Sequence, residues 1–198
     1  MLNRKTLVLT LLLLSSIGVW AQNVGIKTNL LSDAATSPNL GLEFRMAPKW
    51  TFDLSGQVNM WNIHERRWRH WMVQPEARIW ICEAFQGSFF GIHAIGGQYN
   101  IGNLGNMHGL LDHLDFLGSD FSKLKDHRYQ GWGVGGGIAY GYAWMLGKHW
   151  NLEAEIGVGY IYTWFDRYPC TQCGTKDGSG HHNYFGPTKL SLAIEYLF

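Results

Sequence analysis

The sequence predicts an all-β fold, an eight-stranded antiparallel up-and-down transmembrane β-barrel. Three observations predict it: a closing segment with strict two-residue alternation, further segments with the same alternation, and connections between them that are alternately long and short. A period of two places alternate side chains on opposite faces of a strand. In the closing segment, 188–198, polar residues such as Lys189 and Glu195 share one face, which suits water or ions. The other face suits hydrocarbon and carries Leu190, Leu192, Ile194, Tyr196 and Phe198.

The start of the chain has the pattern of an export signal. Two basic residues precede an uncharged run over 6–18, and Val19 and Ala21 then supply a small-residue cleavage site. The uncharged run is too short for a comfortable membrane-spanning helix. The sequence therefore predicts a signal peptide over 1–21, an outer-membrane β-barrel over 22–198, and a location in the cell outer membrane.

The other strands follow from alternation along the chain. The fourth contains Pro75, which cannot donate a ladder hydrogen bond, so we expect a bulge there. In the fifth, the register favours Phe90, Ile92 and Ala94 outward and His93 inward. The eight predicted strands cover 24–31, 38–46, 50–59, 71–81, 88–100, 131–144, 150–164 and 188–198.

The connections alternate in length as an up-and-down barrel requires, with the short turns and both termini at one end. Met107 and several leucines in the longest loop recur at helical spacing, which predicts a short amphipathic helix there. Short turns are predicted at 47–49, 82–87 and 145–149, and longer loops at 32–37, 60–70, 101–128 and 165–182.

Aromatic residues beside these connections predict a belt at each membrane interface. Phe198 also resembles the terminal aromatic signal that bacterial barrel-assembly machinery reads, so that machinery and outer-membrane lipid are expected partners. The belt at the short-turn end is Trp50, Trp144, Trp150 and Phe198, and the belt at the loop end is Trp71, Trp132 and Trp164.

The composition agrees with a surface that faces something other than water. Charged residues make up 16% of the chain, below the roughly 25% of soluble domains, while aromatic residues reach 15% and there are 25 glycines. The net charge of +1 without a basic tail gives no reason to expect a nucleic-acid partner. A nucleotide-binding glycine loop is also absent, and no cofactor is predicted.

Charged residues gather at positions predicted to face inward. The interior of an eight-stranded barrel has room for side chains rather than a wide channel, so we expect ion pairs to fill it. A proton- or ion-conducting path is the alternative, because buried unlike charges can mark such routes. The predicted network comprises Lys27, Glu43, Arg45, Asp53, Glu76, Arg78, Glu153, Glu155, Lys189 and Glu195.

The last predicted loop contains two cysteines and two histidines. Cys170 and Cys173, with His181 and His182, are weak candidates for a zinc site, but their spacing fits no standard signature well. A Cys170–Cys173 disulfide or two free thiols is the preferred interpretation in an exported loop. Cys82 is left unpaired in a predicted turn.

Several segments of the sequence resemble a known Bacteroidota family of outer-membrane proteins catalogued as a domain of unknown function. They begin at Val24 (VGIKTNLL), Pro38 (PNLGLEF), His70 (HWMVQPEAR), Lys125 (KDHRYQGW) and Asn183 (NYFGPTK). The resemblance implies an outer-membrane protein whose gene often neighbours fimbrillin-type genes, and it assigns no catalytic residue. The fold is also similar to small barrels of the OmpA and OmpX type, which is an analogy of fold only.

These observations favour a non-catalytic surface scaffold or interaction protein, linked through the resemblance to fimbrial assembly or anchoring. The alternatives are an enzyme that modifies outer-membrane lipid and a protein that binds metal through its loops. No serine lies in a nucleophile elbow, although Ser179 precedes His181 and His182. We therefore predict that the chain is not an enzyme.

Overall fold

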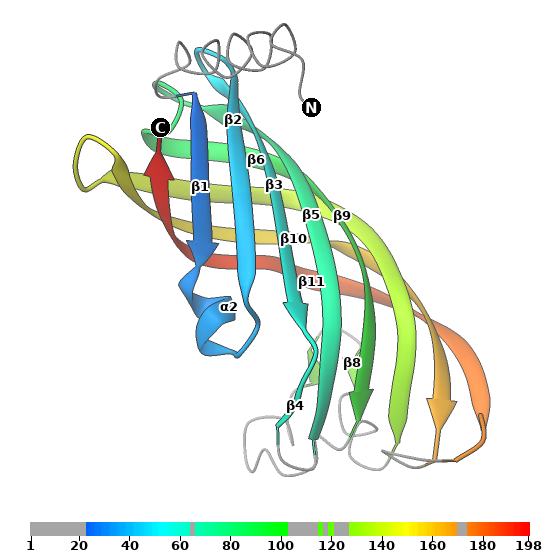
Figure 1. The fold of residues 1–198 in the computed structure, drawn as a ribbon. Helices are drawn as coiled ribbons and strands as arrows, with labels where there is room; N and C mark the ends of the chain where they lie inside the picture. The colour runs from blue at the N-terminus through cyan, green and yellow to red at the C-terminus, as the bar shows by residue number, and fades with distance from the viewer. Residues whose placement is uncertain (1–22, 64–65, 103–114, 117–118, 121–126, 170–173) are drawn as a thin grey trace, which may run out of the picture.

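The chain forms an eight-stranded antiparallel sheet that closes on itself (Figure 1). The computed structural model describes residues 23–63, 66–102, 115–116, 119–120, 127–169 and 174–198. The ring consists of β1 (Val24–Asn29), β2 (Asn39–Ala47), β3 (Trp50–Asn59), β5 (Arg66–Trp80), β6 (Gly87–Gly102), β9 (Arg128–Met145), β10 (Trp150–Tyr168) and β11 (Gly178–Leu197).

Each ring strand pairs with its neighbours in the chain, and pairing of β1 with β11 closes the ring. The start of β1 and the end of β11 therefore lie at the same end, where the tight turns that follow β2, β5 and β9 are also found. The predicted up-and-down order of eight antiparallel strands is confirmed. Four short elements lie outside the ring order: α2 (Leu30–Ala34), β4 (Asn62–Ile63), β7 (Asp115–Phe116) and β8 (Ser119–Asp120).

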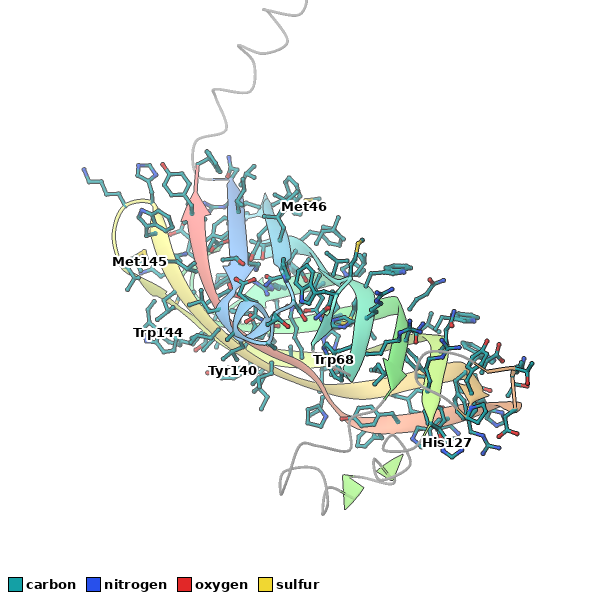
Figure 2. All side chains as sticks on the ribbon, turned by 60° about the horizontal axis from the view of Figure 1, so that its bottom comes forward. Met46, Trp68, His127, Tyr140, Trp144 and Met145 are labelled. Atoms are coloured by element: carbon teal, nitrogen blue, oxygen red, sulfur yellow. The ribbon has the colours of Figure 1, made fainter. Side chains whose placement is uncertain are left out.

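The two faces of the sheet differ as the alternation predicted. Ile92 is 71% exposed, whereas the next residue, His93, is 2% exposed. Phe90 and Ala94 also lie on the outward face, so the predicted register of this strand is confirmed. Figure 2 shows Tyr140 and Trp144 on the outside of the ring. Apolar side chains thus face outward, and polar ones fill the middle of the interior.

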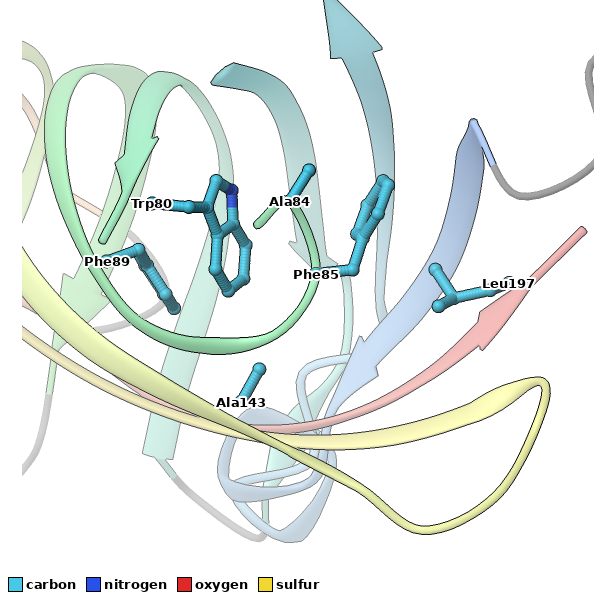
Figure 3. Packing of buried hydrophobic residues seen from close by; sticks show 6 residues of the cluster. All are labelled: Trp80, Ala84, Phe85, Phe89, Ala143 and Leu197. Carbon is cyan, nitrogen blue, oxygen red and sulfur yellow. The ribbon is translucent and has the colours of Figure 1, made fainter. Parts of the chain in front are cut away.

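An apolar cluster fills the interior at the tight-turn end (Figure 3). The Trp80 and Phe89 rings lie 4.6 Å apart between centroids, and Trp80 Nε1 donates a hydrogen bond to Thr51 Oγ1 at 2.9 Å. This plug fills the interior between the polar layer and the tight turns. Its members are Trp80, Ala84, Phe85, Phe89, Ala143 and Leu197.

The ring is much longer on one side than on the other. β9, β10 and β11 have 18, 19 and 20 residues, whereas β1 has 6. The predicted loops 60–70 and 165–182 were consequently too long, because β5 begins at Arg66, β10 ends at Tyr168 and β11 begins at Gly178. Both faces of these extensions are largely polar, so the apolar alternation that marks a strand is missing there.

Two local predictions were wrong. Leu30 and Leu31 were assigned to the first strand, but they begin α2, where the Asn29 side chain accepts a hydrogen bond from the Leu31 amide at 3.1 Å. Such a cap favours a helix start over continued strand pairing. No bulge occurs at Pro75, which pairs with Leu54 of β3. The ladder to β6 keeps the same register on both sides of Pro75, although residues 74 and 75 have no assigned partner there. Register shifts occur instead between Arg45 and Ala47 and between Gly157 and Val158.

Most of the segment 101–128, in which a helix was predicted, lies outside the described residues. Its described parts include the short strands β7 and β8, which pair with each other. Among the helices of the described residues, none has the length and apolar character needed to cross a membrane.

Several glycines of β9 and β10 allow the two backbones to approach closely on the inside of the ring. A Cβ on Gly137 would meet the Val158 carbonyl oxygen and would lie 2.8 Å from Gly159 Cα. These are backbone atoms and cannot move aside as a flexible side chain would. The outward-facing Gly96 of β6 is different, because a Cβ there meets nothing within 4 Å.

Gly137→Ala should therefore lower the free energy of unfolding by about 1 to 3 kcal/mol through overpacking. The measurement is urea unfolding of the refolded chain, followed by tryptophan fluorescence. Gly96→Ala is the matched control and should leave the unfolding midpoint nearly unchanged. Equal midpoints for the two variants would contradict the close approach of β9 and β10.

Candidate functional site

The interior of the ring holds a compact network of charged side chains. The inward positions of β1, β2, β3, β5, β10 and β11 all contribute to it, and each contributing residue is at most 9% exposed. The structure brings together nine of the ten residues predicted to form such a network: Lys27, Glu43, Asp53, Glu76, Arg78, Glu153, Glu155, Lys189 and Glu195.

Arg78 lies at the centre of this network and donates hydrogen bonds to four carboxylates. Its Nε donates to Glu76 Oε1 at 2.6 Å, and its Nη1 donates to Glu43 Oε2 at 2.6 Å and to Glu153 Oε2 at 3.0 Å. Its Nη2 donates to Glu155 Oε2 at 2.8 Å. The planar guanidinium, with donors along three edges, suits this arrangement because one cation can then join several acids.

Two lysines extend the network on either side of Arg78. Lys27 Nζ lies 2.6 Å from Glu43 and 3.1 Å from Asp53. Lys189 Nζ lies 2.6 Å from Glu76 and 3.1 Å from Glu155. Glu43, Asp53 and Glu76 are direct cross-strand partners, and like charges in such positions repel. The three cations offset this repulsion.

Acids outnumber bases in the described part of the interior. The network has six carboxylates and three lysine or arginine side chains. Glu195 has no cation within 4.0 Å among the described residues, and its Oε2 accepts only a long hydrogen bond, 3.4 Å, from Asn151. One oxygen from each of Glu43, Glu153 and Glu195 lies within 4.8 Å of the others. Three acids this close can share a proton or hold a cation between them.

The charge network is continuous with the apolar plug at the turn end. The Arg78 guanidinium lies 4.5 Å from the centroid of the Phe89 ring. Asn151 donates to the Phe85 carbonyl oxygen at 2.9 Å and so links the plug to Glu195. A cavity of about 190 Å³ remains beside the charges, and a larger one of about 1080 Å³ opens at the loop end.

One predicted member of the network lies elsewhere. Arg45 is at the turn end of the ring, where it pairs with Glu83 at 3.0 Å, and both side chains are partly exposed. The alternation assigned Arg45 to the inward face, but alternation does not report distance along the ring axis. The sequence reasoning did not identify Asn151 or Thr188 as polar partners. Thr188 Oγ1 lies 2.8 Å from Nε2 of His93. Inward parity was the available signal for Asn151, whereas Thr188 shares the parity of the outward Leu190 and reaches the interior because the register of β11 shifts beside Lys189.

A family model described as "Protein of unknown function (DUF3575)" matches residues 7–198. The chain belongs to this family. Searches of the curated proteins and of the solved structures give no significant match. The family assignment agrees with the predicted resemblance to a domain of unknown function.

In this DUF3575 member, the candidate zinc ligands do not form a described site. Cys170 and Cys173 lie outside the described residues, so neither the metal nor the disulfide hypothesis is tested. His181 and His182 were placed in a loop but belong to β11, where consecutive residues face opposite sides of the sheet. His181 stacks on Tyr162, with 5.7 Å between ring centroids. Cys82 is exposed and is free among the described residues.

Arg78→Met should lower the free energy of unfolding by about 3 to 5 kcal/mol, because it leaves several buried carboxylates without their cation. Arg45→Met is the matched control. Its partner Glu83 is 63% exposed, and such surface pairs contribute only about 0 to 1 kcal/mol. Urea unfolding of both refolded variants provides the comparison. A loss for Arg45→Met as large as that for Arg78→Met would contradict the central position of Arg78.

Proposed function

We propose that the chain is an outer-membrane β-barrel that crosses the bilayer and acts as a non-catalytic surface scaffold. The observation that carries the proposal is an exposed apolar face on every strand of the ring. Soluble proteins rarely expose large continuous apolar surfaces. Exposed members from successive strands include Ile26, Leu40, Phe44, Phe52, Leu54, Val73, Ile79, Phe90, Ile92, Val134, Ile138, Ile156, Val158 and Leu190.

The height of this apolar face fits a bilayer. Trp132 and Trp144 face outward near the two ends of β9, and both are exposed. A strand rises about 3.4 Å per residue, so this segment is about 40 Å long, or about 30 Å high at a tilt near 40°. Trp50 and Trp150 at the turn end, and Trp71 and Trp164 at the loop end, are also exposed. Aromatic residues at both limits are typical of interfacial belts.

The distribution of charge supports the same proposal. Between the two aromatic belts, the outward positions of the ring carry no Asp, Glu, Lys or Arg. A charge on the lipid face near the midplane costs about 2 to 4 kcal/mol. The charged side chains of these strands face the interior instead, where they pair. Export by the predicted signal peptide, 1–21, and insertion by barrel-assembly machinery are parts of this proposal.

A scaffold fits the interior better than a channel does. The plug and the charge network both occupy the ring interior, and an eight-stranded ring has room for little else. The long strands β9, β10 and β11 carry polar residues beyond the loop-end belt, where a rigid sheet can present binding loops. The resemblance to a family whose genes neighbour fimbrillin-type genes makes a fimbrial component the proposed partner.

A charge placed on the proposed lipid face should block assembly. We expect Val158→Arg to reduce the amount of folded protein in the outer-membrane fraction severalfold, because Val158 is an exposed apolar residue of the band. Ser179→Arg is the matched control, since Ser179 is outward and exposed but lies beyond the belt. The readouts are fractionation and the shift in gel mobility on heating. Recovery of the unmodified chain as a soluble periplasmic protein would end the proposal of a membrane barrel.

The scaffold proposal predicts a protein partner at the loop end. A photo-crosslinking residue at His127, introduced in intact cells, should capture a specific surface protein, and a fimbrial subunit is expected. The same residue at Lys148, in the turn at the opposite end, is the control and should not capture it. Capture of no protein at His127, together with a change in membrane lipid that depends on Ser179 or His181, would favour the enzyme instead.

A further inference from the structure

The outward face of the ring contains a groove of about 540 Å³ that runs along β6 between β5 and β9. Large side chains form its walls: Trp71 from β5 and Trp132 from β9 both flank Gln98, their shared cross-strand neighbour. In the next row toward the band, Val73 and Val134 flank Gly96, and a Cβ on Gly96 would point into open space. A small residue between two large ones therefore forms the floor of a narrow apolar slot.

The walls of the groove are held in place. Trp71 Nε1 donates a hydrogen bond to Gln98 Oε1 at 3.2 Å. Trp132 stacks on Trp164, with ring centroids 4.1 Å apart and planes inclined by 19°. A ligand would meet a groove that is already formed, so little side-chain ordering is needed on binding.

Positive charge gathers directly beyond the loop end of the groove. In the following rows on the same face, Arg69 lies in register with Asn100 and Gln130, and Arg67 and Arg128 flank Gly102. Gly102 has no side chain to separate these two arginines. The Arg128 guanidinium stacks over Tyr168, 4.1 Å from the ring centroid. The arginines thus follow the groove in successive rows on the same outward face.

The charges of Arg67 and Arg128 are not neutralised within the described residues. Neither side chain has a carboxylate within 4.0 Å there, and Arg128 Nε is buried without a hydrogen-bond partner. Arg67 also lies close enough to Arg128 and Arg69 for their like charges to act on it. Cations held near one another in this way favour an anionic ligand.

We propose that this site binds a phosphorylated acyl lipid of the leaflet at the loop end. The phosphate lies against Arg67, Arg69 and Arg128, and one acyl chain occupies the groove over Gly96. Guanidinium groups bind phosphate oxygens in pairs of charge-assisted hydrogen bonds. The apolar groove begins where the arginines end, which suits a ligand with an anionic head and a hydrocarbon chain. The proposal rests on the membrane-spanning barrel proposed above.

Native mass spectrometry of the full chain, refolded in neutral detergent, tests the site. The probes are phosphatidic acid, diacylglycerol with the same acyl chains, and inorganic phosphate. The unmodified chain should bind phosphatidic acid at least about tenfold more tightly than diacylglycerol, a ratio that corresponds to about 1.4 kcal/mol. This comparison needs no variant and is not affected by misfolding of a mutant.

Variants then separate the two halves of the site. Arg67→Gln with Arg128→Gln should abolish the preference for phosphatidic acid. Gly96→Leu, which fills the groove, should weaken both lipids severalfold without changing the binding of inorganic phosphate. The control Lys148→Gln with Lys49→Gln removes two exposed charges at the turn end and should behave as the unmodified chain does.

Equal binding of the two lipids by the unmodified chain would overturn the inference. Inorganic phosphate that displaces phosphatidic acid fully, together with no effect of Gly96→Leu, would overturn it in favour of a free-phosphate site. Heating the same refolded sample before electrophoresis distinguishes the two proposals. A mobility shift without lipid preference contradicts this site alone, whereas the absence of any folded, heat-modifiable form contradicts the barrel and the site together.

Discussion

Arg78 connects strands that would otherwise meet only around the circumference of the ring. Its contacts reach Glu43 on β2, Glu76 on its own strand β5, and Glu153 and Glu155 on β10. Removing these groups from water is costly, and only near-complete pairing offsets the cost. Because the acids come from both sides of the interior, their pairing requires the sheet to be closed. Closure of the ring and satisfaction of the charges therefore depend on each other.

The apolar residues are distributed in the opposite way to those of a soluble domain. A small apolar plug fills the turn end of the interior, polar groups fill the middle, and most large apolar side chains are exposed on the outside. A hydrophobic core of this size cannot by itself account for a closed sheet in water. A hydrocarbon solvent around the ring would make the outward face favourable, and this is the physical basis of the proposed barrel.

The inequality in strand length bears on function. β1 and β2 are short, while β9, β10 and β11 extend well beyond the aromatic belt at the loop end. The extended wall is held by backbone pairing along its whole length. It can therefore present loops and Arg128 rigidly, just beyond the apolar band. The proposed partner surface belongs to this longer wall, whereas the proposed lipid site lies at its edge, on β5, β6 and β9.

The sequence by itself determined the number and order of the ring strands, their tight turns and the face on which most of their residues lie. Strand alternation is local, and Lys189 and Glu195 already show it over a few residues. Tertiary structure decided the rest. Alternation carries no information on position along the ring axis, so Arg45 was placed in the network although it pairs with Glu83 at the turn end. The groove over Gly96 and the arginine rows depend on the joint register of β5, β6 and β9, and only pairing in the closed sheet sets that register.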